Sequence, residues 1–396
     1  MKVIILGPRE PVPPSRGGAI EKLTWNFAHA LARHNIDVWL LGATLDPSHI
    51  NHTLQIDGVN VYYVTLPIRD SLFYFRKMPY VSKKMSTIIS RILEEERRED
   101  AIIHSVYFYN LISIKPKIPV IVSEFEHYPW IPEYMYHRPF LGVTNRIRWD
   151  IDSSLRIALA KLLLKRASVV HSISRYQASN ILKHVPSIAD RLIIIPNFVD
   201  TTKYKPVDAE ELREKLLEDF EVLAGFVGRL TPHKGLHILI KSMALLDDNT
   251  RRRVRLVVIG PKAPGFYIKQ KENDQYINYV YYLIRKYNLE KNVIFLGDVR
   301  EELMPNYFSA LDFLIHPSLV EAFGLVVIEA MACGKPVIVF DIPPLNEIVK
   351  NDVGLLVEPS VKSLSKAIYD MANNTTLRKS WAFNTRNYVL ARYSLE

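Results

Sequence analysis

The chain has 396 residues, of which 48% are hydrophobic and 23% charged, and it contains one cysteine, Cys333. This composition predicts two folded domains with packed cores and excludes disordered and collagen-like proteins. A single cysteine also excludes a disulfide framework and a cysteine-ligated zinc or iron–sulfur centre. The net charge is +9, and residues 1–200 contribute most of it, with 25 Lys and Arg against 18 Asp and Glu. Such an excess indicates an anionic partner: phosphate groups, nucleic acid or an acidic membrane surface.

Neither a targeting segment nor a membrane span is evident in the sequence. The first apolar run, residues 3–6, is four residues long, which is shorter than the apolar core of a signal peptide. No later run approaches the roughly 18 apolar residues that cross a bilayer. We therefore expect a cytoplasmic protein without an integral membrane anchor.

Short apolar runs alternate with amphipathic helical patterns along the whole chain. The runs that predict strands are residues 3–6, 38–41, 102–104, 120–123, 169–173, 192–195, 222–227, 254–259, 293–296, 313–315, 336–340 and 354–357. They are nearly continuous rather than alternating, which is typical of parallel strands covered on both faces. Between them lie helical patterns such as residues 19–33. This order predicts an α/β fold with parallel, doubly wound sheets.

The pattern restarts near the middle of the chain, after a polar, proline-flanked stretch without periodicity. We predict an N-terminal domain at residues 1–196, a linker at 197–206 and a C-terminal domain at 207–375. A last helix at 376–396 is expected to pack back on the N-terminal domain. Because ligands of doubly wound sheets bind outside the carboxyl ends of the strands, we expect the two Rossmann-like domains to face each other across a ligand-binding cleft.

A glycine pair, Gly17 and Gly18, opens the first predicted helix after a strand and a proline-rich loop. Glycines there allow a ligand to approach the backbone, and the helix N-terminus favours an anion. The loop lacks the G-x-G-x-x-G pattern and a carboxylate at ribose-binding spacing, which argues against a nicotinamide dinucleotide. The alternative is a turn that needs glycine for its geometry alone.

A basic loop follows the first strand of the second half and has the sequence Gly228-Arg229-Leu230-Thr231-Pro232-His233-Lys234-Gly235. Arg229 and Lys234 are five residues apart and suit a diphosphate without a metal ion. Charge-assisted contacts of this kind contribute about 1.5–3 kcal/mol each. The alternative is an ordinary solvated basic surface.

Two acids, Glu321 and Glu329, lie in the segment 316–334 around a predicted helix start at Gly324. The N–H groups of residues 324–326 are then free to bind a phosphate or a sugar hydroxyl. Glu329 lies within an apolar stretch, where a carboxylate needs a hydrogen-bonding partner such as a ribose hydroxyl. Glu321 precedes the helix and is placed to meet the group beyond the phosphates. The alternative is a pair of ordinary helix acids.

These segments together resemble the retaining GT-B glycosyltransferases of family 4, the group 1 glycosyltransferases. Seven residues separate Glu321 from Glu329, as in the E-x7-E signature of that family. The pair at 17–18 is similar to the N-terminal glycine loop of the family, and 196–200 resembles its interdomain N-G-V-D segment. Residues 228–235 resemble its G-R-L-x-x-x-K-G motif. The resemblance covers nearly the whole chain.

The resemblance implies a role for each matching charged residue. Arg229 and Lys234 would bind the diphosphate of the donor and stabilise the leaving group. Glu329 would bind the ribose hydroxyls, and Glu321 the hydroxyls of the donor sugar.

The resemblance also implies contacts for the matching glycines and their neighbours. The backbone of Phe323, Gly324 and Leu325 would touch the distal phosphate or the sugar, and Gly18 would approach the diphosphate from the other domain. Gly17, Asn197 and Gly228 belong to the same substrate-binding motifs. Residues 342–347 depart from the family pattern, because relatives carry glycines there, so the shape of this loop stays open.

The family further has a histidine after a first-domain strand, close to the reacting carbon of the donor sugar. We assign this role to His127. Strand length alone would place Phe125 at that position, and a shift of two residues would leave the role to Glu126 or to no residue. His104 ends another strand and is expected to be a packed, hydrogen-bonded histidine.

The resemblance implies a hexosyltransferase that moves a sugar from a nucleoside-diphosphate donor to a saccharide or lipid-linked acceptor, without a metal or other cofactor. Fixed cations beside the leaving diphosphate stabilise the charge that develops there. Asp150 and Asp152 form the D-x-D of a metal-dependent transferase, but they open a helical pattern, where acids are common.

Several alternatives remain at this point. A glycosidase also uses two carboxylates, but has no need for paired cations. A soluble transferase with a small-molecule acceptor, of the disaccharide synthase type, and a non-catalytic nucleotide-sugar-binding protein are further alternatives. A nicotinamide oxidoreductase shares the fold class but not the glycine fingerprint. Nucleic acid is not expected, because the basic excess is diffuse and no recognition motif is present.

Two basic segments of the first half, residues 72–84 and 146–166, interleave cations with apolar side chains. Both suit an anionic bilayer, where each cation near the surface contributes about 1 kcal/mol. We therefore expect peripheral contact with the inner surface of a membrane. The alternative is that both segments pack within the protein.

Overall fold

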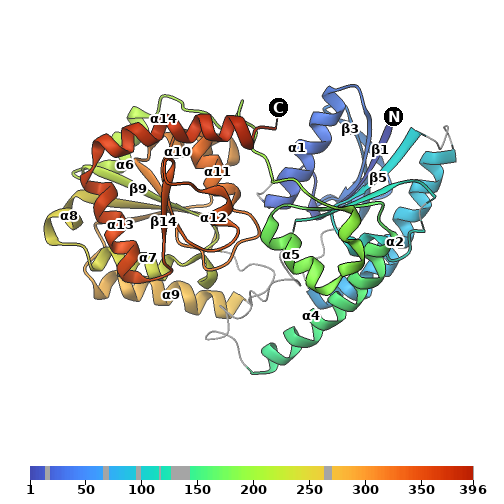
Figure 1. Cartoon of the computed structure of the whole chain (residues 1–396), viewed down its shortest axis with the longest axis horizontal. Helices are drawn as coiled ribbons and strands as arrows, with labels where there is room; N and C mark the ends of the chain where they lie inside the picture. The colour runs from blue at the N-terminus through green and yellow to red at the C-terminus, as the bar shows by residue number, and fades with distance from the viewer. Residues whose placement is uncertain are drawn as a thin grey trace. The chain divides into compact units, whose positions relative to one another are not determined.

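The computed structural model describes residues 1–13, 18–65, 71–94, 100–115, 117–125, 143–262 and 270–395. The chain forms two compact units: Met1–Pro132 with Ile147–Pro196, and Glu133–Arg146 with Asn197–Glu396. Each unit is a sheet with helices packed on it, parallel throughout in the second unit and parallel except for one strand pair in the first (Figure 1). Two doubly wound α/β domains, as the alternation of strands and helices predicts, are therefore confirmed.

The first unit contains an eight-stranded sheet of order β3-β4-β2-β1-β5-β6-β7-β8. Its strands are β1 (Lys2–Pro11), β2 (Asp37–Ala43), β3 (Thr53–Ile56), β4 (Val59–Thr65), β5 (Ala101–Ser105), β6 (Val120–Glu124), β7 (Val169–Ser172) and β8 (Leu192–Ile194). All neighbouring pairs are parallel except β3 with β4. These two strands join through Asp57 and Gly58, both at positive φ (49° and 81°), as in tight hairpins with Asp-Gly turns.

The helices of the first unit fill the connections between its strands. They are α1 (Ala19–Arg33), α2 (Ser71–Glu94), α4 (Val143–Leu163) and α5 (Arg175–His184), with short 3₁₀ turns η1 (Pro47–His49), η3 (Phe108–Leu111), η5 (Leu164–Arg166) and η6 (Pro186–Arg191). Helix α1 packs on β1 and β2, and α2 packs on β4. In the part of the chain that the structure describes, no helix combines the length and apolar character needed to span a membrane.

The second unit contains a six-stranded sheet of order β11-β10-β9-β12-β13-β14, in which every neighbouring pair is parallel. Its strands are β9 (Val222–Val227), β10 (Val254–Ile259), β11 (Val293–Gly297), β12 (Phe313–His316), β13 (Val337–Phe340) and β14 (Gly354–Val357). The direction of winding reverses between β9 and β12. Ligands of open α/β sheets bind at the carboxyl ends of the strands at such a reversal.

Helices cover both faces of the second sheet. They are α6 (Glu210–Leu217), α7 (Leu236–Ala244), α8 (Asp248–Arg253), α9 (Gln270–Lys286), α10 (Met304–Ala310), α11 (Leu325–Ala332), α12 (Leu345–Ile348), α13 (Val361–Asn373) and α14 (Thr375–Arg392), with 3₁₀ turns η7 (Pro232–Lys234) and η8 (Glu301–Leu303). Helix α7 contacts α9 and α13, and their apolar side chains share one core with β9 and β10. Helix α11 contacts α10 and α14 (Figure 1).

Residues 197–206, expected to be a linker, pack within the second unit. Val199 pairs with Ser394 in an isolated parallel bridge. Arg386 of α14 donates hydrogen bonds to the carbonyl oxygens of Thr201 and Tyr204. Helix α14 itself packs on α11 and α13, so the second unit continues beyond residue 375. Packing of this helix on the first domain would be a contact between the two units and stays a prediction.

Candidate functional site

Two loops lie side by side at the carboxyl ends of the central strands β9 and β12. The N–H of Leu319 donates to the carbonyl oxygen of His233 at 2.7 Å, and the Ser318 hydroxyl donates to the same oxygen at 3.3 Å. These contacts join the basic loop after β9 to the acidic loop after β12. The winding reversal therefore brings together two motifs that are far apart in the sequence.

Gly235 permits the close approach of the two loops. It ends the η7 turn with a left-handed backbone, at φ 75° and ψ 13°. A Cβ atom at this position would lie 1.9 Å from the carbonyl oxygen of Pro317, far inside van der Waals contact. Only glycine combines this backbone conformation with this close contact, which explains the K-G step of the basic motif.

Lys234, Glu321 and His316 form the centre of the site. His316, the last residue of β12, donates from Nε2 to Glu321 Oε1 at 2.7 Å, and the Lys234 ammonium forms an ion pair with the same oxygen. Glu321 is only 8% exposed. Burial alone raises the pKa of Glu321, but the charge of Lys234 and the hydrogen bond from His316 outweigh it and hold this pKa well below its ordinary value. Glu321 is therefore an ionised, buried carboxylate at neutral pH.

Helix α11 begins beside Glu321 and presents an uncapped N-terminus. Its N-cap is Gly324, at φ 108°, without a side-chain capping bond, and its first turn contains no acid. The first N–H groups of a helix lack intrahelical partners and carry a partial positive charge. Such a terminus suits a phosphate or a hydroxyl oxygen. The sequence prediction of a helix from near Gly324 to Gly334 is confirmed.

The remaining predicted residues of the second unit lie in or near these loops. Arg229 is exposed on the β9 loop, and no acid among the described residues forms an ion pair with it. Gly228 directly follows β9. Phe323 is buried against the ring of Tyr393, and Leu325 is half-buried at the start of α11.

Glu329 lies in the middle of α11 and is half-buried. Its carboxylate lies close to the Cys333 thiol and the Tyr204 hydroxyl. Burial raises the pKa of Cys333 to about 12 and also raises that of Tyr204, and the negative charge of Glu329 adds to both shifts. Asn197, at the start of the second unit, is buried. The predicted contacts of Glu329 and Asn197 with substrate stay predictions.

In the first unit, Gly18 is the N-cap of α1, in an extended conformation. A Cβ atom there would lie 1.7 Å from a carboxylate oxygen of Glu21. The positive end of this helix therefore already faces an acid of its own first turn. Gly17, Glu126 and His127 lie outside the described residues, so the assignment of the family histidine stays a prediction.

The first unit also contains a buried polar row that the sequence indicated only in part. Ser123 lies between His104 Nε2 at 2.6 Å and His171 Nδ1 at 2.8 Å, and His171 Nε2 donates to the Ile195 carbonyl oxygen at 2.7 Å. Burial lowers the pKa of His104 to about 3. His104 is thus a packed, neutral histidine, as expected.

Phe125 contacts the ring of His171 edge to face, at a centroid distance of 6.0 Å. The Phe125 ring thus packs against the end of the buried row of polar side chains. Phe125, which strand length alone would place at the family histidine position, is therefore a packed aromatic side chain.

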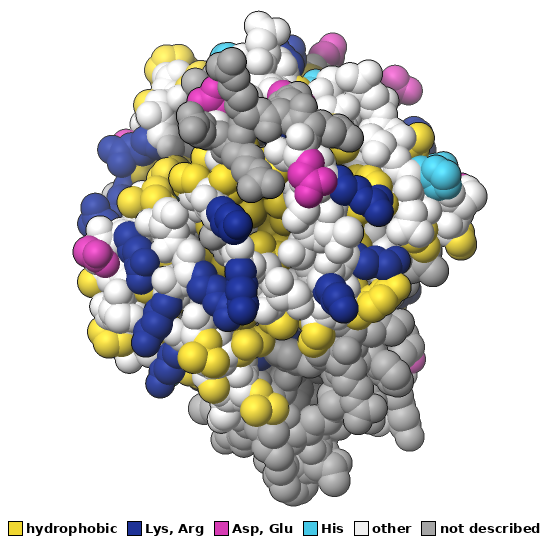
Figure 2. All heavy atoms as spheres, turned by 90° about the vertical axis from the view of Figure 1, so that its right-hand side faces the viewer, with side chains coloured by type: hydrophobic (Ala, Val, Ile, Leu, Met, Phe, Trp, Pro, Cys, Tyr) yellow, Lys and Arg dark blue, Asp and Glu magenta, His cyan; other side chains and the backbone are white. Residues whose placement is uncertain are grey.

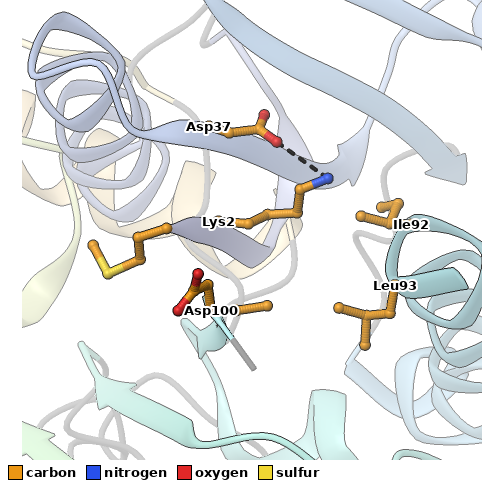
Figure 3. Close-up of a pocket in the computed structure, with 7 residues that line it drawn as sticks. Lys2, Asp37, Ile92, Leu93 and Asp100 are labelled. Carbon is orange, nitrogen blue, oxygen red and sulfur yellow. Dashed lines mark ion pairs between the residues drawn. The ribbon is translucent and has the colours of Figure 1, made fainter. Parts of the chain in front are cut away.

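A pocket of about 330 Å³ lies at the opposite, amino-terminal edge of the first sheet. Lys2 at the start of β1 pairs with Asp37 at the start of β2 at 3.1 Å, and Ile92 and Leu93 of α2 lie across from them (Figure 3). Ligands of parallel α/β sheets bind at the carboxyl ends of the strands. We therefore do not include this pocket in the candidate site.

Two units of this topology, with paired cations and an E-x7-E motif in the second, define a GT-B glycosyltransferase. The family model described as "Glycosyl transferases group 1" matches residues 208–388, and that described as "Glycosyltransferase Family 4" matches residues 17–203. The chain belongs to the group 1 glycosyltransferases of family 4.

Relatives of the chain support this assignment. The D-inositol 3-phosphate glycosyltransferase of Rhodococcus jostii is 33% identical over 187 residues, which are 46% of this chain and 39% of that protein. The chain thus matches about two fifths of the length of this relative. The uncharacterized glycosyltransferase MJ1607 of Methanocaldococcus jannaschii is 26% identical over 393 residues, which cover 96% of this chain and 92% of that one.

Solved structures show the same fold. The sucrose-phosphate synthase of Thermosynechococcus elongatus superimposes with a TM-score of 0.81 at 21% identity, covering 99% of this chain and 95% of that one. Anabaena HepE in complex with UDP and glucose gives a TM-score of 0.70 at 21% identity, with the same coverage.

Proposed function

We propose that the protein transfers a hexosyl group from a nucleoside-diphosphate sugar to a saccharide or lipid-linked saccharide, with retention of anomeric configuration and without a metal ion. The observation that carries the proposal is the Lys234–Glu321 pair beside the open N-terminus of α11. This arrangement combines a cation, an ionised hydrogen-bond acceptor and free N–H donors at the ligand-binding edge of the sheet. The UDP and glucose in the HepE complex are consistent with such a donor.

The charges of the site suit a donor with an anionic tail and a neutral, hydroxyl-rich head. Lys234 has three N–H donors, so its contact with Glu321 leaves others for a phosphate oxygen. Arg229 adds a second cation on the same loop, and the N-terminus of α11 adds N–H groups. Glu321, which is ionised and accepts hydrogen bonds only, suits the hydroxyls of the sugar. We assign Glu329 to the ribose hydroxyls.

The same groups would favour the transition state over the bound donor. In the transfer, the bond between the anomeric carbon and the distal phosphate oxygen breaks, and negative charge grows on the leaving diphosphate. Cations and N–H groups already in place stabilise that charge without reorganisation. The acceptor hydroxyl forms the new bond on the same face of the sugar, and its proton passes to the leaving phosphate oxygen. We assign His127 to the reacting end of the donor sugar.

A screen of nucleotide sugars tests the donor site. A ligand at about 100 times its Kd adds about 2.7 kcal/mol of apparent stability. We expect one of UDP-glucose, GDP-mannose or ADP-glucose to raise the melting temperature, and excess EDTA to leave both this shift and the transfer unchanged. Release of the nucleoside diphosphate together with a glycosylated product would support a transferase. Hydrolysis without transfer, or no shift with any donor, would contradict the proposal.

We further propose that the acceptor side of the protein rests on an anionic membrane. Residues 78–93, 101–123 and 153–166 contain nine Lys and Arg and no Asp or Glu. The exposed cations among them are Lys83, Arg91, Lys115, Lys117, Lys161, Lys165 and Arg166. Figure 2, which faces the first unit, shows Lys and Arg spread among hydrophobic side chains, with few acids.

Hydrogen bonds place these segments next to one another. The N–H of Ser113 donates to the Ser82 hydroxyl of α2 at 2.8 Å, and Arg166 donates to the carbonyl oxygen of Leu111 at 3.0 Å. Tyr80 and Leu162 are exposed at 61% and 65%. Cations around exposed apolar side chains fit an anionic lipid surface. The side chains of residues 72–77 and 146–152, which were part of the predicted basic segments, lie outside the described residues.

Sedimentation with vesicles tests this surface. We expect binding to vesicles of phosphatidylglycerol and phosphatidylcholine, and loss of about 1 kcal/mol of binding free energy for each cation replaced. A variant with Lys83, Lys161 and Lys165 changed to Ser should sediment less, while its donor-induced thermal shift stays at the wild-type value. Undiminished sedimentation of this variant would contradict a membrane contact through this face, as would equal binding to neutral vesicles.

A further inference from the structure

His316 has a fixed position in the second sheet. It is the last residue of β12, which is buried along its whole length, and it pairs in register with Val339 of β13. Its side chain is 3% exposed. The ring therefore projects from a rigid central strand, whereas Lys234 reaches Glu321 from a loop on a flexible side chain that is 20% exposed.

The two donors to Glu321 meet the same carboxylate oxygen. His316 Nε2 and Lys234 Nζ both contact Oε1. Among the described residues, no side chain or N–H group donates to Oε2. Because an ionised carboxylate only accepts hydrogen bonds, the proton of the His316–Glu321 bond belongs to Nε2. The other ring nitrogen, Nδ1, is buried and has no hydrogen-bond partner among the described residues. The single hydrogen bond that positions the ring is therefore the one to Glu321.

We propose that His316 is a positioning residue that holds Oε1 of Glu321, so that Oε2 is presented to a hydroxyl of the donor sugar. This inference rests on the proposed function. When a donor diphosphate draws Lys234 toward its own oxygens, the bond from the rigid strand keeps the carboxylate in place. His316 thus serves recognition of the sugar, while Lys234 serves the diphosphate.

Two replacements of similar chemistry separate this role from simple packing. In His316→Gln the amide nitrogen extends to about the position of Nε2 and donates to Glu321. In His316→Asn the shorter side chain brings its amide only as far as the position of Nδ1. Both variants remove the ring and keep a polar amide, and they differ by a single methylene group.

The experiment measures binding of each nucleotide sugar and of its nucleoside diphosphate alone: UDP-glucose with UDP, GDP-mannose with GDP and ADP-glucose with ADP. For the pair of ligands that wild type binds, we expect His316→Asn to weaken binding of the nucleotide sugar by about 10-fold, which is the effect of one charge-assisted hydrogen bond. Binding of the nucleoside diphosphate should change by less than about 2-fold. His316→Gln should bind the nucleotide sugar within about 3-fold of wild type.

The possible failures have different meanings. If wild type binds none of the six ligands, the proposed function is wrong, and this inference with it. If wild type binds a donor, but His316→Asn weakens binding of the nucleoside diphosphate as much as binding of the nucleotide sugar, then His316 only supports the loop. Equal binding of the nucleotide sugar by wild type and both variants would also overturn the positioning role, as would a His316→Gln variant no better than His316→Asn.

Discussion

Helices α1 and α11 both begin at a glycine after a strand near the centre of a parallel sheet, but their N-termini differ. Glu21 lies in the first turn of α1, with its carboxylate against Gly18. The first turn of α11 contains no acid, and Gly324 provides no side-chain cap. The positive end of α1 therefore faces an acid of its own first turn, whereas the first turn of α11 contains no acid and its N–H groups can bind a ligand. A glycine before a helix is thus a weak signal until the first-turn residues are read with it.

The polar groups at the carboxyl edges of the two sheets differ in charge as well. The second unit contains an ionised carboxylate and a lysine. Behind the carboxyl edge of the first lies a buried row in which burial lowers the pKa of both His104 and His171, so both rings are neutral at pH 7. This difference in charge supports our proposal that the second unit binds the anionic donor.

The largest expected effect comes from two matched glycine replacements. In Gly235→Ala the new Cβ meets the backbone carbonyl of Pro317 at 1.9 Å, and φ is 75°, so we expect a loss of about 3 kcal/mol. In Gly18→Ala the obstructing atom is the end of the flexible Glu21 side chain, and the loss should be below about 1 kcal/mol. Calorimetric unfolding checks both variants. Similar shifts of the melting temperature would show that the second unit does not depend on the close contact of its two loops.

Removing the lysine of the site should mainly affect transfer. We expect Lys234→Ala to lower kcat/KM by about 10- to 100-fold, the range of one charge-assisted contact, while the protein stays folded. Lys215→Ala, at an exposed position of α6, is the matched control and should keep the wild-type rate. Initial rates of nucleoside diphosphate release measure both. Near-normal kinetics of Lys234→Ala would contradict binding of the diphosphate by this loop.

Removing Glu329 should have an effect near the lower end of that range. We expect Glu329→Ala to lower transfer by about 10-fold through loss of the ribose contact. A donor with a 2′,3′-dideoxyribose lacks the hydroxyls of this contact. With that donor, the variant and wild type should therefore transfer at the same rate. An equal loss with both donors would mean that Glu329 acts through the packing of α11 near Tyr204.

The smallest expected effect concerns acid. Burial lowers the pKa of His104 from 6.5 to about 3, so the unfolded chain binds a proton that the folded chain does not. Stability is then complete above pH 6.5 and falls as the pH decreases toward 3. Between pH 7 and 6, wild type should lose about 0.7 kcal/mol more than His104→Gln, which does not titrate. Urea denaturation at both pH values measures the difference. Parallel losses in the two proteins would show that His104 is not buried in its neutral form.

Much of the fold was predictable because buried parallel strands leave a continuous apolar record in the sequence. The strands that this criterion missed, β3 and β4, have alternating burial, and a hairpin joins them at Asp57-Gly58. Asp-Gly between alternating residues is the signal that could have found them. The sequence pattern of residues 197–206 predicted a linker because the partners of this segment, Arg386 of α14 and Ser394, lie 182 to 193 residues later in the chain.

The residue types of the site were predictable, but their contacts were not. The spacing of Arg229 and Lys234 and of the two glutamates followed from the sequence, as did the start of α11 at Gly324. The contact of Lys234 with Glu321 joins residues 87 positions apart, and it exists because β9 and β12 are neighbours at the winding reversal. His316 gave no separate signal, since a histidine at the end of a buried strand is equally typical of packing, as His104 illustrates.

Hydrogen–deuterium exchange with and without the stabilising nucleotide sugar tests the central claim most directly. If the second unit binds the donor, peptides that contain residues 228–235 and 316–329 should exchange more slowly with the donor present, and Lys234→Ala should abolish this protection at the same donor concentration. Protection confined to the first unit, or unchanged exchange of both peptides while the donor still raises the melting temperature, would contradict the assignment.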